Sequence, residues 1–169
     1  MLCKFQGLSP QYPEDKYDIV IPGSEIPKWF SHQSLGAEVN IKEPYSHLCN
    51  ELMGIVVCVV FCSQDNHPHH QIDNYHHLTC WLIANGKQMS VAPFVSVNPK
   101  VISSNLWLLY MGPKWYTKVS KKLLWECNAN GFSQVGIKIS NHGSTFKVKK
   151  CGLCMVYKKD IEDLNRSTV

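Results

Sequence analysis

The residues best suited to bind a metal gather in one histidine-rich stretch. This stretch contains His67, His69, His70, His76 and His77. Imidazole is a common ligand of transition metals. A structural zinc site, however, needs four convergent ligands with defined spacing, and no Cys-x-x-Cys pair stands beside this stretch. We therefore expect a solvated loop without a resident metal, and keep metal binding as the alternative.

A second candidate is Cys151-Gly152-Leu153-Cys154, which has the spacing of redox and zinc motifs. Those motifs lie in loops or at the start of a helix, whereas this segment has the pattern of a strand. Residues three apart on a strand point to opposite faces, so the two thiols should diverge. Gly152 indicates a bulge or a close backbone approach, and a bulge would keep pairing of the thiols open.

The other cysteines predict buried, unpaired thiols. Cys58, Cys62 and Cys80 lie inside apolar runs, where cysteine behaves as a small hydrophobic residue. Cys58 and Cys62 share a strand face but stand roughly 13 Å apart, which is beyond disulfide reach. A thiol in apolar surroundings has a raised pKa, and a cysteine hydrolase would also need a nearby imidazole. With no Gly-x-Ser-x-Gly and no phosphate loop, we expect no enzyme and no cofactor.

Size and charge indicate one soluble domain. The 169 residues are 44% hydrophobic and 18% charged, which is ordinary globular composition. Residues 1–84 carry 4 Lys against 9 acidic residues, and residues 85–169 carry 13 Lys and Arg against 4. These lysines suit the outer faces and edges of strands, with an anionic partner as the alternative. Nucleic acid fits poorly, because the single arginine is Arg166 and no RNA- or DNA-binding motif is present.

No apolar run is long enough for a signal peptide or a membrane helix. We therefore expect a cytoplasmic location, with the nucleus as a second one, and no membrane partner.

Strand patterns dominate the chain, and no segment keeps a helical period beyond two turns. The sequence predicts an all-β, antiparallel two-sheet β-sandwich of about nine strands. The expected strands cover residues 17–21, 38–42, 54–62, 78–84, 87–91, 106–111, 123–127, 134–139 and 145–157. Asn85-Gly86 predicts a type I′ hairpin. Residues 1–16 would form a lead-in, 17–159 the sandwich, and 160–169 a polar tail that forms a helical turn or frays.

Two segments, residues 19–36 and 148–157, carry a family resemblance, supported by 53–61 and 105–110. Together they resemble the C-terminal jelly-roll/Ig-like domain that follows the leucine-rich repeats in plant TIR-type nucleotide-binding immune receptors. The resemblance implies a module that helps the repeats of the same receptor bind a pathogen effector protein. It also implies an isolated domain that is a monomer and a full receptor that oligomerises on activation, when a distant TIR domain acts on NAD.

The matching residues also have a physical interpretation. Pro22, Gly23 and Pro27 impose turns, and Ile26, Trp29 and Phe30 could then pin the leading segment onto the sandwich. We expect a structural motif, to which Cys151 and Gly152 belong in the last strand.

Binding residues are expected on loops at the ends of the sandwich. If strands alternate along the chain, 63–77, 93–103 and 128–132 share one end, and 44–52, 112–122 and 141–144 share the other. The first candidate surface is 63–77 with 93–103, because both loops are long. Its proposed anchors are His67, His69, His70, Tyr75 and His76. The second candidate surface is 111–122, where Trp115 and Tyr116 stand beside Lys114.

Two other functions remain open at this point. Jelly rolls often bind sugars through exposed aromatic side chains, so a lectin-like module is one alternative. The other is a purely structural cap on the apolar end of a repeat solenoid, which would have no ligand of its own.

Overall fold

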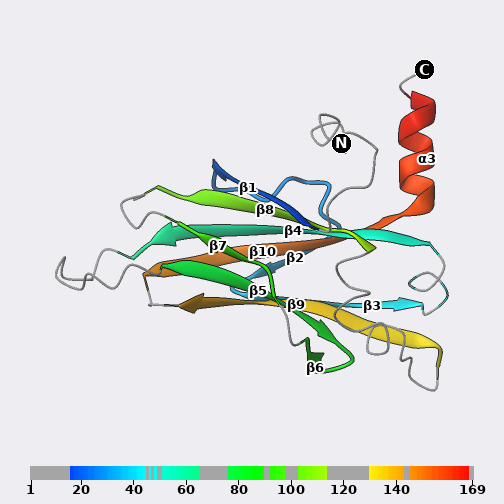
Figure 1. Ribbon diagram of the computed structural model, residues 1–169, viewed down its shortest axis with the longest axis horizontal. Helices are drawn as coiled ribbons and strands as arrows, with labels where there is room; N and C mark the ends of the chain where they lie inside the picture. Colours follow the sequence, from blue (N-terminus) through cyan, green and yellow to red (C-terminus); the bar gives the residue numbers. More distant parts are fainter. Residues whose placement is uncertain are drawn as a thin grey trace.

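The computed structural model describes residues 16–44, 46, 48, 51–64, 76–89, 92–97, 103–113, 130–142 and 145–167. Within them lie ten strands and the C-terminal helix α3 (Figure 1). The strands are β1 (Lys16–Pro22), β2 (His32–Leu35), β3 (Glu38–Pro44), β4 (Leu52–Ser63), β5 (His77–Ala84), β6 (Lys87–Gln88), β7 (Phe94–Ser96), β8 (Asn105–Met111), β9 (Phe132–His142) and β10 (Phe146–Tyr157). Helix α3 covers Lys158–Ser167.

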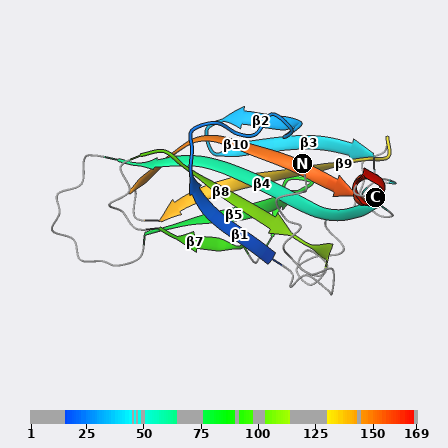
Figure 2. The ribbon, with the colours of Figure 1, turned by 90° about the horizontal axis from the view of Figure 1, so that it is seen from above.

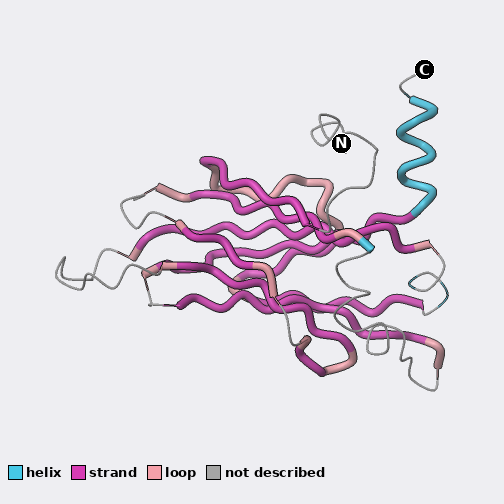
Figure 3. The backbone as a smooth tube through the Cα atoms, in the orientation of Figure 1, coloured by secondary structure: helices cyan, strands magenta, loops and turns pink. Residues whose placement is uncertain are grey.

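The strands form two sheets, and every pairing between them is antiparallel. The first sheet has the order β1-β8-β4-β10-β2; the second has the order β3-β9-β5-β6, with β7 also paired to β5. Strands β4 and β10 run side by side along the sandwich (Figure 2). The expected antiparallel two-sheet β-sandwich is confirmed, and strand dominates the described chain (Figure 3).

The number of strands differs slightly from the expectation. Strands β2 and β7 were missed because each has only four or three residues and lacks a long apolar alternation. Strand β6 is shorter than expected, with two residues. The strand expected at 123–127 lies outside the described residues.

Strand β4 is apolar throughout because both of its faces are covered. Ile55, Val57, Val59 and Phe61 face the core between the two sheets. The alternate residues Val56, Cys58 and Val60 belong to a second cluster, which also contains Ile26 and Phe30 from the segment after β1. Each fully buried aliphatic side chain stabilises the fold by about 1.5–3 kcal/mol. This strand is therefore the centre of two apolar layers.

The predicted hairpin forms between β5 and β6. Asn85 and Gly86 have φ angles of 50° and 79°, the left-handed values that a type I′ turn requires. The Asn85 side chain also accepts a hydrogen bond of 2.9 Å from the backbone N–H of Gln134 on β9. The turn is thereby tied to the neighbouring strand.

The expected tail is a regular helix rather than a frayed end. Asp160 in its first turn accepts a 2.8 Å hydrogen bond from the backbone N–H of Tyr157, which satisfies a donor at the helix start. Ile161 packs against the second cluster. None of the helices in the described part of the chain has the length and apolarity to cross a membrane.

The expected grouping of loops was wrong for two of them. His77 pairs with His142, and Ser63 pairs with Phe146, so the 141–144 connection lies at the same end as 63–77. Phe132 pairs with Pro44, which places the start of β9 at the opposite end. The error arose because one strand at 123–127 was assumed to carry the chain across the sandwich, whereas β8 ends and β9 begins at the same end (Figure 1).

Candidate recognition surface

Three ring side chains gather where β5 begins and β9 ends; they are His77, His142 and Phe94, and we call them the ring cluster. The imidazoles of His77 and His142 stack with their centroids 4.5 Å apart and their planes at 25°. Phe94 of β7 meets His77 edge-on, with 5.7 Å between centroids. The Phe94 side chain is 58% exposed. The cluster therefore presents an aromatic surface to solvent on a strand framework.

Backbone pairing fixes this cluster in place. His77 is the register partner of Ser96 on one side and of His142 on the other. The carbonyl of Pro93 accepts a 2.9 Å hydrogen bond from the N–H of Cys80. Nearby, the Lys16 ammonium lies 3.4 Å from the Phe94 carbonyl oxygen and 6.0 Å from its ring centroid. Residues from four strands thus position one small surface.

His76 plays a different part from its neighbour. Its Nδ1 shares a hydrogen bond with the Thr145 hydroxyl, and its ring meets the edge of Phe146, at 6.4 Å between centroids. Phe146 in turn packs edge-on against Phe61 in the core. The His76 carbonyl also accepts a 3.1 Å hydrogen bond from Val97. His76 therefore anchors the end of the first candidate surface to the core.

The structure brings together the described parts of the two loops expected to form the first surface, residues 76–77 and 94–97. The other predicted anchors lie outside the described residues: His67, His69, His70, Tyr75, Lys114, Trp115 and Tyr116. The sequence reasoning missed Phe94, which was taken as part of a loop, and His142, which was assigned to the opposite end. Correct strand order would have found His142, because it is the direct neighbour of His77.

Two of the three apolar residues of the family motif lie against the first sheet. Ile26 and Phe30 are buried against the outer face of the first sheet. Trp29 is only half-buried and stacks on Phe30, with 4.2 Å between ring centroids. The Phe30 N–H donates to the Pro27 carbonyl at 3.0 Å, which closes the turn that Pro27 begins. Gly23, after Pro22, donates through its N–H to the Ser104 carbonyl at 3.1 Å.

Gly152 is a point of close approach and not a bulge. A Cβ atom at this position would lie 3.1 Å from both Ile26 Cγ2 and Phe30 Cδ1. The register shifts of β10 instead fall between Val148 and Lys150 and between Val156 and Tyr157. The missing side chain at Gly152 therefore leaves room for Ile26 and Phe30 at this point of β10.

The two cysteines beside Gly152 diverge as predicted. Cys151 belongs to the core between the sheets, and Cys154 packs against the second cluster on the other face. The described cysteines, Cys58, Cys62, Cys80, Cys151 and Cys154, are all free thiols. Burial, with a smaller effect of Cys151, raises the pKa of Cys58 to about 12. Burial followed by the charge of Glu38 raises the pKa of Cys151 to about 11. Such thiols stay protonated and are poor nucleophiles.

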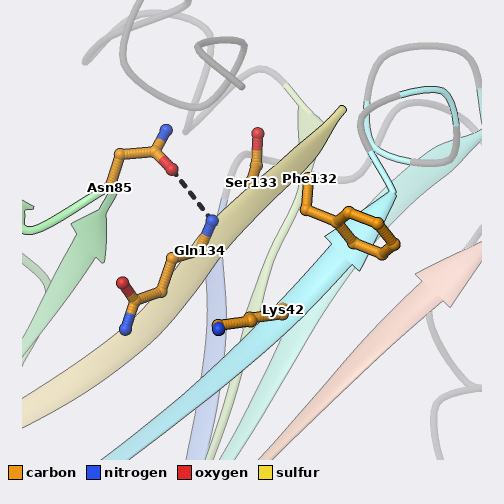
Figure 4. A pocket seen from close by; sticks show the side chains of 5 residues that line it. All are labelled: Lys42, Asn85, Phe132, Ser133 and Gln134. Carbon is orange, nitrogen blue, oxygen red and sulfur yellow. Dashed lines mark hydrogen bonds between the residues drawn. The ribbon is translucent and has the colours of Figure 1, made fainter. Parts of the chain in front are cut away.

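A shallow pocket of about 290 Å³ lies at the opposite end of the second sheet (Figure 4). Its lining residues are Lys42, Asn85, Phe132, Ser133 and Gln134. The Asn85 amide is engaged with the backbone of Gln134, as the dashed line in Figure 4 shows. Within the described residues, no group of three or more His, Cys, Asp or Glu side chains is arranged to hold a metal ion.

Residues 21–162 match the family model of the C-JID domain. The chain is also similar to two Arabidopsis thaliana proteins over 87% of its length. These are disease resistance protein RPS4, at 27% identity over 169 residues, and disease resistance protein RPS4B, at 26% identity over 164 residues. The disease resistance-like protein CSA1 from the same plant is 42% identical over 48 residues, or 28% of this chain and 4% of that protein.

The chain spans only 13% of the length of RPS4 and 14% of RPS4B. A solved structure described as the EclA C-terminal domain, a sugar-binding protein, aligns at a TM-score of 0.27 and 9% identity, covering 87% of this chain and 84% of that one. At this identity and TM-score, the likeness supports no conclusion about this chain. The sequence matches confirm the expected resemblance to the domain that follows the repeats in TIR-type receptors. The chain belongs to the C-JID domain family of plant disease resistance proteins.

Proposed function

We propose that this domain is a non-catalytic recognition module that helps a disease resistance receptor bind a pathogen effector protein through the end that carries the ring cluster. The observation that carries the proposal is Phe94, a large apolar side chain that is 58% exposed and rests edge-on against His77. Aromatic residues often supply most of the binding energy at protein interfaces. An exposed ring held on strands loses little conformational entropy on binding.

The surroundings of Phe94 support a protein partner. Strand β5 pairs with β7, which carries Phe94, on one side and with β9 on the other. The backbone of this surface is therefore in place before a partner binds. The exposed residues Ser96 and His142 and the half-buried His77 offer hydroxyl and imidazole groups that can form hydrogen bonds at a polar rim.

The place of the module in a larger receptor follows from its relatives. Since the chain spans 13% of RPS4, we propose that the rest of the receptor, including leucine-rich repeats, forms the second half of the binding surface. We also propose a cytoplasmic location, with the nucleus as a second one. The free thiols of the described residues fit a reducing compartment.

The experiment compares two exposed apolar residues within the full receptor. Phe94→Ser should reduce co-precipitation of the effector by about tenfold or more, as expected for an interface anchor. Leu35→Ser is the matched control, because Leu35 is 82% exposed but lies on β2 at an edge of the first sheet. Both variants should accumulate to the wild-type level. Equal effector binding by the Phe94 variant and the wild type would remove this end from the interface.

A further inference from the structure

His77 and His142 lie opposite each other on neighbouring strands, which places their imidazoles within reach of one common ion. They are direct partners in an antiparallel register, and their side chains stand on the outer face of the second sheet. Directly opposed residues have Cβ atoms about 4.5–5.5 Å apart, so neither backbone has to move for the rings to reach a common ion. The two ligands are therefore placed by the sheet and not by a loop.

The spacing of the rings agrees with shared coordination. An imidazole nitrogen binds zinc at about 2.0–2.1 Å, so two imidazoles on one ion have ring centroids about 4.5–5.5 Å apart. The observed centroid separation is 4.5 Å. In the stacked arrangement, with 25° between the ring planes, the in-plane lone pairs of the two imidazoles run nearly parallel. Each ring must therefore rotate about its Cβ–Cγ bond to turn one nitrogen toward a common ion.

The nitrogen atoms of this pair are also available. Among the described residues no hydrogen bond engages the ring of His77 or His142, whereas His76 is held by Thr145. His142 is exposed and His77 is half-buried, so an ion could enter from solvent and keep water as its remaining ligands. Phe94 meets the His77 ring edge-on, with 5.7 Å between the ring centroids.

We propose that His77 and His142 form a two-imidazole site for a divalent transition metal such as Cu²⁺, Ni²⁺ or Zn²⁺, which are the ions that imidazole ligands favour. The site has two protein ligands, which is consistent with the absence of any three-ligand group in the described chain. It does not depend on the proposed recognition function.

The test is a titration of the whole chain with CuCl₂, NiCl₂ and ZnCl₂, in which binding is measured by calorimetry and by NMR. His142→Gln and His77→Gln should each weaken the tightest binding step by about 100-fold, because the second imidazole then no longer binds intramolecularly. Substoichiometric Cu²⁺ should broaden the amide signals of residues 77 and 142 first. The matched control is His32→Gln, since His32 stands on β2 in the first sheet and should leave the titration unchanged.

Two results would overturn the site. One is binding of equal strength in His142→Gln and in the parent protein, which would assign the bound metal to other histidines. The other is copper broadening that spares residues 77 and 142. Circular dichroism of each variant should show the parent spectrum, because both histidines lie at strand ends on the solvent face.

Discussion

Gly152 lies directly beneath the ring of Phe30, so that a Cβ atom on this glycine would stand 3.1 Å from Phe30 Cδ1. The two residues are 122 positions apart and belong to the two segments that carry the family resemblance. Their contact gives the resemblance a physical cause. The turn at Pro27 places Phe30 over the first sheet, and the bare backbone of β10 leaves room for it.

This contact predicts a coupling between the two positions. Gly152→Ala should lower the free energy of unfolding by about 1–3 kcal/mol, as overpacking does. In a Phe30→Leu background the smaller side chain should reduce that loss, with a coupling free energy of about 0.5–3 kcal/mol. Urea unfolding of the four proteins measures it.

Gly54→Ala is the matched control for this cycle. A Cβ atom at Gly54 would meet Tyr110 and not Phe30, and Gly54 lies four residues along β4 from Cys58, the register partner of Gly152. Its cost should therefore be the same in both backgrounds. If Gly152→Ala proved just as costly in the Phe30→Leu protein, the contact would not be the cause of the glycine.

Phe30 should matter more for stability than Trp29, although tryptophan is the larger residue. Phe30 is 2% exposed, while Trp29 is half-buried and lies on top of it. Phe30→Ala should cost about 3–5 kcal/mol. Trp29→Ala should cost about 1–2 kcal/mol, since only part of the Trp29 side chain is buried and the substitution removes only that buried apolar area. Urea midpoints in the reverse order would contradict the burial of these two rings.

The buried indole of Trp107 predicts a role for Asp18. Trp107 is fully buried, and its Nε1–H donates to the Asp18 carboxylate at 3.0 Å. Asp18→Ala should cost about 1–3 kcal/mol, because the indole N–H loses its acceptor. Asp18→Asn keeps an acceptor oxygen and serves as the control, with a smaller loss. Thermal unfolding that ranks the two variants equally would show that the hydrogen bond is not the stabilising contact.

The buried thiols predict a loss of stability at alkaline pH. Cys151 and Cys58 have pKa values raised to about 11 and about 12 in the folded protein, against about 8.5 for an unfolded cysteine. Between those values the unfolded chain has released protons that the folded chain still binds, so unfolding becomes easier as pH rises. The contribution is complete below about pH 8.5 and is lost through about pH 11–12.

Unfolding in urea at a series of pH values measures this loss. Burial raises the pKa of four described thiols, Cys58, Cys80, Cys151 and Cys154. Cys58→Ala removes one of them, so the decline between about pH 8.5 and 11 should become less steep than in the parent. An unchanged pH dependence would show that the Cys58 thiol does not contribute. Burial also raises the pKa of Tyr110. Because Cys58→Ala leaves Tyr110 in place, the difference between variant and parent isolates the contribution of the Cys58 thiol.

The sequence by itself determined the features that depend on neighbouring residues. The apolar run of β4 predicted a strand covered on both faces, Asn85-Gly86 predicted the hairpin, and the spacing of Cys151 and Cys154 predicted diverging thiols. These follow from strand periodicity and turn chemistry, which are local. The turns at Pro22 and Pro27 were predicted on the same grounds.

Only the tertiary structure decided which distant residues meet. The pairing of His77 with His142, the exposure of Phe94 and the close approach of Phe30 to Gly152 all depend on strand order and register. Register is set by the packing of whole sheets, and a single miscounted strand reverses the end at which every later loop emerges. For that reason His142 was assigned to the wrong end, although its neighbours in sequence had been interpreted correctly.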